Sequence, residues 1–100
     1  MFVFEYHDEK AKINLIKHKV SFEEAKSVFH DINGLEFFDT EHSDAEDRFI
    51  YIGYSSKQRV LFVSFTIRDN VYRIISAKKL TKAEIRYYGY NWLQRRKWSS

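Results

Sequence analysis

The 100-residue chain contains no cysteine and no long apolar run, and each absence excludes a class of protein. Without thiols, the chain has no disulfide scaffold, no thiolate nucleophile and no cysteine-ligated zinc or iron–sulfur centre. No stretch approaches the roughly 20 apolar residues of a membrane-spanning helix. The N-terminal residues also lack the pattern of a secretory signal peptide. We therefore expect a protein of the cytoplasm without a membrane partner.

Proline is absent as well, and only three glycines are present. Nucleotide-binding loops of the P-loop and Rossmann types need several closely spaced glycines, which excludes both. The acidic stretch 39–47 lacks the spacing and the glycine of an EF-hand, so a solvated, flexible loop is favoured over a cation site. Four histidines lie at positions without a metal-binding spacing: His7, His18, His30 and His42. We expect no metal and no cofactor.

The formal charge of +3 conceals three blocks of different charge along the chain. Residues 1–30 contain five acidic and five basic residues, and residues 31–47 contain seven acidic residues and no lysine or arginine. Residues 48–100 contain twelve basic residues and two acidic ones. Charge blocks of this size mark interaction surfaces or solvated loops, and the basic block indicates a polyanionic partner.

Three segments have the capping residues and the periodicity of helices. Asp8 is the expected N-cap of a helix over about 9–18. Ser21-Phe-Glu-Glu24 is a capping box that opens a second helix, which ends at about Phe29. Thr81-Lys-Ala-Glu84 repeats the capping box and opens a third helix. The apolar face of this third helix is expected to carry Ile85, Tyr88 and Trp92.

Between the second and third helices, four segments have strand character: Leu35–Asp39, Arg48–Tyr54, Val60–Arg68 and Val71–Lys78. Asp69-Asn70 joins the last two, and it is typical of a tight hairpin because both residues tolerate positive φ. The element order predicts one α+β domain over residues 1–100. We expect an antiparallel sheet of three to four strands, with two N-terminal helices and a C-terminal helix.

The two-residue turn also predicts the register of the hairpin: Arg68 opposite Val71, Thr66 opposite Arg73, and Ser64 opposite Ile75. Because side chains alternate along a strand, one face then forms the core. The core residues are Leu61, Val63, Phe65, Ile67, Tyr72 and Ile74. The opposite face carries two guanidinium groups and two hydroxyls, and it is either a binding surface or an ordinary solvated face.

This combination of cationic, hydroxyl and aromatic side chains is typical of proteins that bind RNA. Guanidinium groups bind phosphate in a bidentate manner and aromatic rings stack on unpaired bases. Segment 87–98 interleaves both kinds of side chain. Metal-free RNA cleavage needs a base for the 2′-hydroxyl proton, cations for the phosphorane and an acid for the leaving 5′-oxygen. Lys10, Lys17 and His18 are candidates near the first helix, although His18 also has the competing role of stabilising the helix dipole.

Several short motifs follow one another in the order known from one protein family: Phe4-Glu-Tyr-His-Asp8-Glu-Lys10, Asn14, Lys17-His18-x-Val20-Ser-Phe22-x-x-Ala25, Val28-Phe29, Arg48 before Gly53, Arg73-Ile-Ile-Ser-Ala-Lys-Lys79, and Thr81 with Glu84 and Tyr88. In these motifs the chain resembles the BrnT-type toxins of bacterial type II toxin–antitoxin modules. The Lys-His-x-Val-Ser-Phe and Ile-Ser-Ala blocks are the most specific parts. The resemblance covers nearly the whole chain.

The resemblance implies a RelE-like α+β fold and a metal-independent endoribonuclease that cleaves RNA and inhibits translation. It also implies that a cognate DNA-binding antitoxin neutralises the toxin. The toxin would then contact operator DNA only indirectly, through the antitoxin. The matching positions and the hairpin face together give the catalytic candidates, among which Arg68 is a weaker match: Lys10, His18, Arg68, Arg73, Lys78 and Tyr88. The candidates for binding RNA phosphate are Lys17, Arg48, Lys79 and Arg86.

One position of this scheme and two other hypotheses stay open. Family members usually have arginine at the position of Lys78, and lysine replaces a bidentate fork with a point charge. A second hypothesis is a module that binds nucleic acid or an antitoxin segment without cleaving RNA, which predicts salt-sensitive RNA affinity alone. A third concerns the acidic segment 31–47, which either contacts a basic region of the antitoxin or covers the basic face of the free protein.

Overall fold

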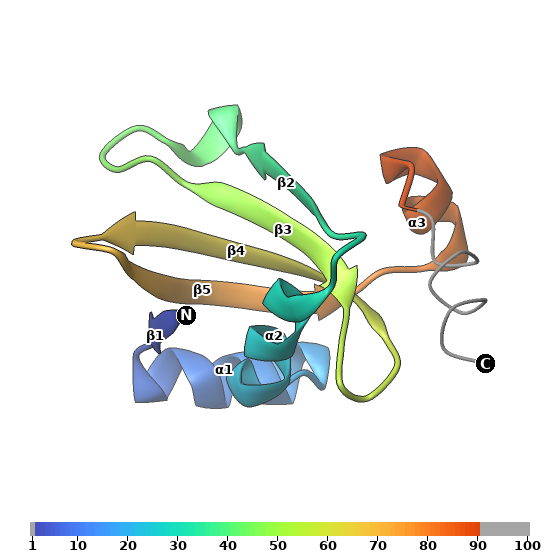
Figure 1. The fold of residues 1–100 in the computed structure, drawn as a ribbon. Helices are drawn as coiled ribbons and strands as arrows, with labels where there is room; N and C mark the ends of the chain where they lie inside the picture. Colours follow the sequence, from blue (N-terminus) through green and yellow to red (C-terminus); the bar gives the residue numbers. More distant parts are fainter. Residues whose placement is uncertain (1, 91–100) are drawn as a thin grey trace.

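A five-stranded sheet forms the centre of residues 2–90, the part of the chain that the computed structural model describes (Figure 1). The strands, in the spatial order β1-β5-β4-β3-β2, are β1 (Val3–Glu5), β2 (Leu35–Phe38), β3 (Phe49–Tyr54), β4 (Val60–Arg68) and β5 (Val71–Lys79). The helices are α1 (Asp8–His18), α2 (Phe22–Ser27) and α3 (Lys82–Tyr88), with short 3-10 turns at Val28–His30 and Thr40–His42. None of these described helices is long and apolar enough to cross a membrane.

The α+β class and the positions of the three helices are confirmed, but the predicted antiparallel sheet is wrong. Strands β2 to β5 are antiparallel neighbours, whereas β1 runs parallel to β5, with Val3 opposite Val71 and Glu5 opposite Arg73. The sheet of residues 2–90 is therefore mixed, and it has five strands instead of three to four. A three-residue strand is too short to show the alternation on which a strand prediction depends.

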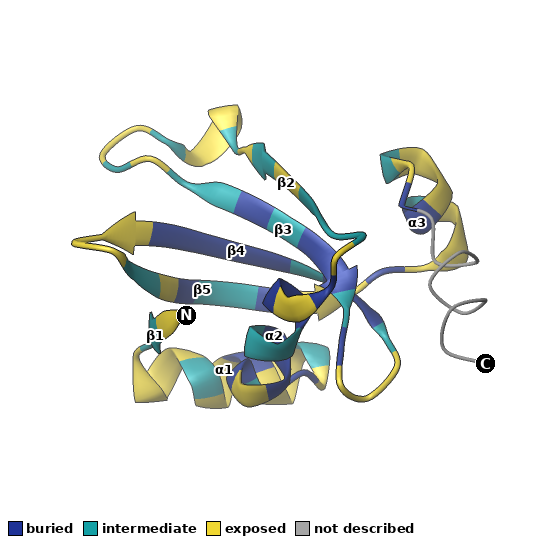
Figure 2. Ribbon diagram, viewed as in Figure 1, coloured by how far each residue is buried: buried dark blue, intermediate teal, exposed yellow. Residues whose placement is uncertain are grey.

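Helices α1 and α2 lie on one face of the sheet (Figure 1). Leu61, Val63 and Phe65 of β4 project to this face and form a core with residues of α2. Figure 2 shows that β4 is buried along most of its length, whereas much of α1 is exposed. One predicted core residue differs: Ile67 is 39% exposed, because it lies at the hairpin end of β4, which projects beyond the helices (Figure 1).

The opposite face of the sheet is covered over part of its length by α3. Ile85 of α3 and the preceding Leu80 pack with Ile50 and Ile52 of β3 in a second core. Gly89, the C-cap of α3, has a left-handed φ of 76°, which turns the chain so that Tyr90 is buried in the same core. Because α3 covers only the end of the sheet away from the β4–β5 turn, no helix of residues 2–90 lies over the other end of this face (Figure 1).

The predicted helix starts are confirmed at α3 and wrong at α1. The Thr81 hydroxyl accepts a hydrogen bond from the Glu84 N–H at 3.2 Å, and the Thr81 N–H donates to the Glu84 carboxylate at 2.9 Å. This is the full capping box. At α1, however, Asp8 is the first helical residue and His7 is the N-cap, without a side-chain hydrogen bond. The third predicted member of the apolar face of α3, Trp92, lies outside the described residues.

At α2, only half of the predicted capping box forms, because Glu24 has other partners. The Ser21 hydroxyl accepts from the Glu24 N–H at 3.0 Å. The Glu24 carboxylate is buried and accepts from Ser55 Oγ at 2.6 Å and from Arg59 Nε at 3.0 Å. Burial alone raises the pKa of Glu24, but the hydrogen bonds from Arg59 and Ser55 outweigh it and lower the pKa below its ordinary value. The ionised carboxylate therefore joins α2 to the turn before β4.

The turn of the β4–β5 hairpin is confirmed, and the predicted register is correct only near it. Asp69 and Asn70 both have positive φ, 49° and 67°. Arg68 lies opposite Val71 and Thr66 opposite Arg73, but the pairing of Ser64 with Ile75 is wrong.

The register changes because β5 contains a bulge at Ile75, so that Ser64 lies opposite Ser76. A bulge adds one residue to one strand and reverses the side to which the following side chains point. Arg73, Ser76 and Lys78 consequently share the face of the sheet that α1 and α2 do not cover.

The side chain of Asn14, which is 5% exposed, fastens α1 to the edge of β5. Its amide nitrogen donates to the carbonyl oxygens of Val20 and Ala77, both at 2.9 Å, and its amide oxygen accepts from the Ala77 N–H at 3.1 Å. Strand β1 pairs with β5 only over residues 71–73. At Ala77 the asparagine amide therefore supplies the two hydrogen bonds that a neighbouring strand would otherwise make.

We expect Asn14→Ala to lower the free energy of unfolding by about 2–4 kcal/mol, because buried N–H and C=O groups lose their partners. Asn14→Asp should be comparably harmful, since a carboxylate accepts from the Ala77 N–H but cannot donate to the two carbonyls. Urea unfolding measures both changes, with the exposed Lys12→Ala of the same helix as control. Equal stability of Asn14→Ala and the control would contradict the role of Asn14.

The lowered pKa of Glu24 predicts how stability depends on pH. Its contribution is complete above the ordinary glutamate pKa and is lost as the pH falls through the lowered value of the folded state. We expect Glu24→Gln to be less stable than the wild type at neutral pH and to lose less stability on acidification. Urea midpoints across the acid range test this, and parallel curves for both proteins would rule it out.

Candidate nucleic-acid interface

The uncovered part of the second sheet face is hollowed in three connected places. An inner hollow of about 490 Å³ lies beside α3, an outer hollow of about 410 Å³ lies toward the β4–β5 turn, and an edge hollow of about 170 Å³ lies beside α1. His42 and Arg48 line both the inner and the outer hollow. Lys10 and Ile75 line the outer and the edge hollow, and Ser76 lines the inner and the edge hollow. The three hollows form one continuous surface, which we call the basic face.

Eight of the ten predicted site residues line the basic face. Lys78 and Tyr88 line the inner hollow, and Arg68 and Arg73 line the outer hollow. Lys17 and His18 line the edge hollow. Two residues are shared: Arg48 lines the inner and outer hollows, and Lys10 lines the outer and edge hollows. The other two lie apart from it. Lys79 lies beside Leu80 and Thr81 at the opposite end of the hairpin, and Arg86 is exposed on α3 and lines none of the three hollows.

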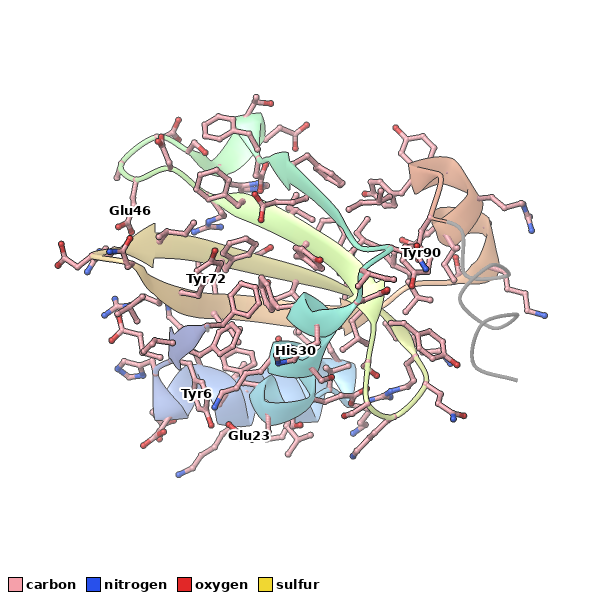
Figure 3. All side chains as sticks on the ribbon, viewed as in Figure 1. Tyr6, Glu23, His30, Glu46, Tyr72 and Tyr90 are labelled. Carbon is pink, nitrogen blue, oxygen red and sulfur yellow. The ribbon has the colours of Figure 1, made fainter. Side chains whose placement is uncertain are left out.

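Two arginines of the outer hollow are paired with carboxylates. The Arg68 guanidinium donates to both Glu46 oxygens, at 2.6 and 3.1 Å, and Arg73 Nε donates to Glu5 at 3.0 Å. Glu46 belongs to the acidic segment 31–47, and Figure 3 shows it beside the turn end of β4. Its hydrogen bonds with Arg68 lower the pKa of Glu46 and raise the pKa of Arg68, so both are charged at neutral pH. The hypothesis that segment 31–47 covers the basic face of the free protein predicts an ion pair such as that of Glu46 with Arg68.

Buried hydroxyls lie between the cations of the basic face. Thr66 and Ser64 are 2% and 7% exposed. The Thr66 hydroxyl, in a residue that lines the outer hollow, has no hydrogen-bond partner in the described part of the chain. An unpaired buried hydroxyl is costly, so Thr66 lowers the stability of the strand on which it lies.

Tyr88 closes the inner hollow on the side of α3. Its ring stacks on Phe37 at 5.8 Å and lies 5.7 Å from Phe62, while the Lys78 ammonium lies over the Phe62 ring at 5.0 Å. Burial raises the pKa of Tyr88, and the neighbouring Tyr87 raises it further. The phenol is therefore protonated at neutral pH, and it can donate a hydrogen bond or a proton but does not act as a base.

His42 is a residue of the basic face that the sequence patterns did not single out. Its Nδ1 lies 2.9 Å from Asp39 Oδ2, and the other oxygen of Asp39 accepts from the Glu41 N–H at 3.2 Å. Thr40–His42 is thus a hydrogen-bonded 3-10 turn within the stretch 39–47, for which a solvated, flexible loop is predicted. The signal in the sequence is an aspartate three residues before a histidine, a spacing that aligns two side chains along a 3-10 turn.

The basic face offers the chemistry of an anion-binding site that also carries an imidazole ring. Within residues 2–90, no group of three or more histidine, aspartate or glutamate side chains is placed to hold a metal ion. The cations come from α1, from Arg48 just before β3, and from β4 and β5, and the hydroxyls come from β4 and β5. Such a surface fits a phosphodiester, whose oxygens accept charge-assisted hydrogen bonds.

Known proteins share this sequence pattern and this fold. The family model "Ribonuclease toxin, BrnT, of type II toxin-antitoxin system" matches residues 6–84. A similar solved structure is the 1.1 Å crystal structure of the Brucella abortus ribonuclease toxin BrnT, with a TM-score of 0.64 and 16% sequence identity. The match covers 82% of this chain and 100% of the Brucella chain. No curated protein sequence matches the chain. Since the family model spans most of its length, the chain belongs to the BrnT family of ribonuclease toxins of type II toxin–antitoxin systems.

Proposed function

We propose that the chain is a metal-independent endoribonuclease that cleaves RNA on the basic face. The observation that carries this proposal is the gathering of Lys10, Arg48, Arg68 and Arg73 in one hollow of the sheet face. A phosphodiester supplies acceptor oxygens for several of these cationic groups together. Membership of a family of ribonuclease toxins supports RNA as the source of the phosphodiester.

The residues of the basic face divide the chemical work. Arg48, Arg73 and Lys78 bind the phosphate and stabilise the charge that develops on the phosphorane. Lys78 does so as a single point charge, without the two-pronged geometry of arginine. Tyr88 donates the proton to the leaving 5′-oxygen. This transfer is favourable even from a phenol of raised pKa, because an alkoxide is a far stronger base than a phenolate.

In the cell, we propose that this cleavage inhibits translation in the cytoplasm and that a cognate antitoxin stops it. The family's place in type II toxin–antitoxin systems supports the antitoxin partner. A partner that presents carboxylates to the basic face could replace Glu46 and Glu5 on their arginines. We further propose that the antitoxin binds DNA, so that the toxin contacts operator DNA only through it.

The first test is cleavage of single-stranded RNA in EDTA. We expect the wild type to cleave, and Arg73→Ala to lower the rate constant by about 10²–10³-fold, the effect of losing one transition-state donor. The matched control is Lys57→Ala, which also removes one positive charge but lies in the exposed turn before β4. Salt-sensitive RNA binding without any cleavage would instead support the module that binds without cutting. Undiminished cleavage by Arg73→Ala would remove Arg73 from the mechanism.

The covering role of Glu46 has its own test. Because Glu46→Gln removes the negative charge from Arg68, we expect RNA to bind about two- to fivefold more tightly in low salt. The difference should shrink in high salt, which screens exposed ion pairs. Glu36→Gln, in the same acidic segment but on the other face of the sheet, opposite Tyr51, is the control. Equal affinities of the two variants for RNA would show that the contact is incidental.

A further inference from the structure

Of the four histidines, all of which are described, His42 is the one with a carboxylate partner. His30 packs against Phe2 on the helical face, 5.9 Å between ring centroids. His7 precedes α1 as its N-cap, and His18 lines the edge hollow at the end of that helix. His42 lines the inner and the outer hollow, which places it where the phosphate-binding cations meet.

Asp39 is held firmly enough to orient the ring. Its side chain is 12% exposed, whereas that of His42 is 58% exposed. The backbone of Asp39 is tied to the start of β3, because its N–H donates to the Arg48 carbonyl at 2.8 Å. Ser43 Oγ donates to the Asp39 carbonyl at 2.6 Å and accepts from the Arg48 N–H at 3.0 Å. These bonds fix Asp39, and with it the His42 ring, relative to Arg48, the residue just before β3.

The hydrogen bond to Asp39 also determines which nitrogen of His42 carries the proton. A carboxylate accepts only, so Nδ1 carries the hydrogen, and in the neutral ring Nε2 keeps its lone pair. Nε2 has no hydrogen-bond partner among residues 2–90. A ring fixed in this tautomer is prepared to accept a proton from a group in the hollow, the arrangement that a general base requires.

The groups around His42 favour a bound phosphodiester at this point. From the strands and helices that line the inner and outer hollows, the cations are Lys10, Arg48, Arg68, Arg73 and Lys78, and the carboxylates besides Asp39 are Glu41, Asp44 and Glu46. One of these carboxylates is already paired with Arg68. The positive charge without an ion pair in residues 2–90 is contributed by Lys10 in the outer hollow and by Arg48 and Lys78, which both line the inner hollow with His42.

We infer that His42 is the general base of the proposed ribonuclease reaction and that Asp39 is its positioning residue. The inference rests on the proposed function. The 2′-hydroxyl proton moves to Nε2 of His42 while the bond between the 2′-oxygen and phosphorus forms. The bond between phosphorus and the 5′-oxygen then breaks, and the 5′-oxygen takes a proton from Tyr88. The products are a 2′,3′-cyclic phosphate and a 5′-hydroxyl end, and water restores the two side chains to their starting protonation states.

The test compares His42→Ala with His30→Ala, a histidine of the opposite face, in single-turnover cleavage of RNA. We expect His42→Ala to be slower by about 10²–10⁴-fold, the usual contribution of a general base. RNA affinity and melting temperature should stay within the range of the control, because the exposed ring contributes little to binding or packing. Added imidazole should restore part of the rate to His42→Ala and leave His30→Ala unchanged.

Asp39→Asn separates positioning from structure. We expect nitrogen-15 NMR of the wild type to show His42 as the Nδ1–H tautomer, and of Asp39→Asn to show a mixture, with a reduced rate constant and unchanged RNA affinity. Cleavage at the wild-type rate by His42→Ala, or a loss of rate that only reflects lost RNA affinity, would overturn the role of His42 and leave the proposed function standing. Absence of cleavage by the wild type itself would remove both.

Discussion

The placement of α1 depends on one asparagine side chain, and the composition of the basic face depends on that placement. Asn14 gives Ala77 the two hydrogen bonds of a neighbouring strand at a point beyond the end of β1. Lys10 and His18 are four residues before and after Asn14, so they lie on the same side of the helix. The apolar residues Ile13 and Ile16 are 59% and 73% exposed. Polar contacts to the strand edge therefore contribute more than apolar burial to holding these cations in place.

The bulge at Ile75 has a similar consequence on β5. In a regular strand, Arg73 and Lys78 are an odd number of residues apart and point to opposite faces. The extra residue brings both to the basic face and places Ser76 opposite Ser64. The resemblance of the Ile-Ser-Ala block to the family motif singled out Lys78, but the alternation argument on its own would have put it in the helical core. The family motif at residues 75–77 thus includes the bulge that brings Lys78 to the basic face.

The features predicted from sequence are those in which a few adjacent residues decide the outcome. The Asp69-Asn70 turn and the capping box of Thr81 are local, and both form. The missed features depend on distant partners. Strand β1 exists because β5 offers an edge to it, and Glu24 leaves its expected cap because Arg59 and Ser55 reach it from another turn. The place of His42 between two hollows likewise requires β3, β4 and β5 to be assembled first.

The acidic segment has two different effects on the basic face, and their strengths limit what each can do. The Asp39 side chain is 12% exposed and its backbone is hydrogen-bonded to Arg48, so it can orient the ring of His42. Glu46 covers Arg68 in an ion pair whose side chains are 36% and 53% exposed, and exposed pairs are weak. On the proposed function, RNA that displaces Glu46 exchanges one anion for another at Arg68 and loses little. The segment would then moderate RNA binding without blocking it, and full inhibition would need a partner that occupies several cations at once. The family's place in type II toxin–antitoxin systems agrees with such a partner.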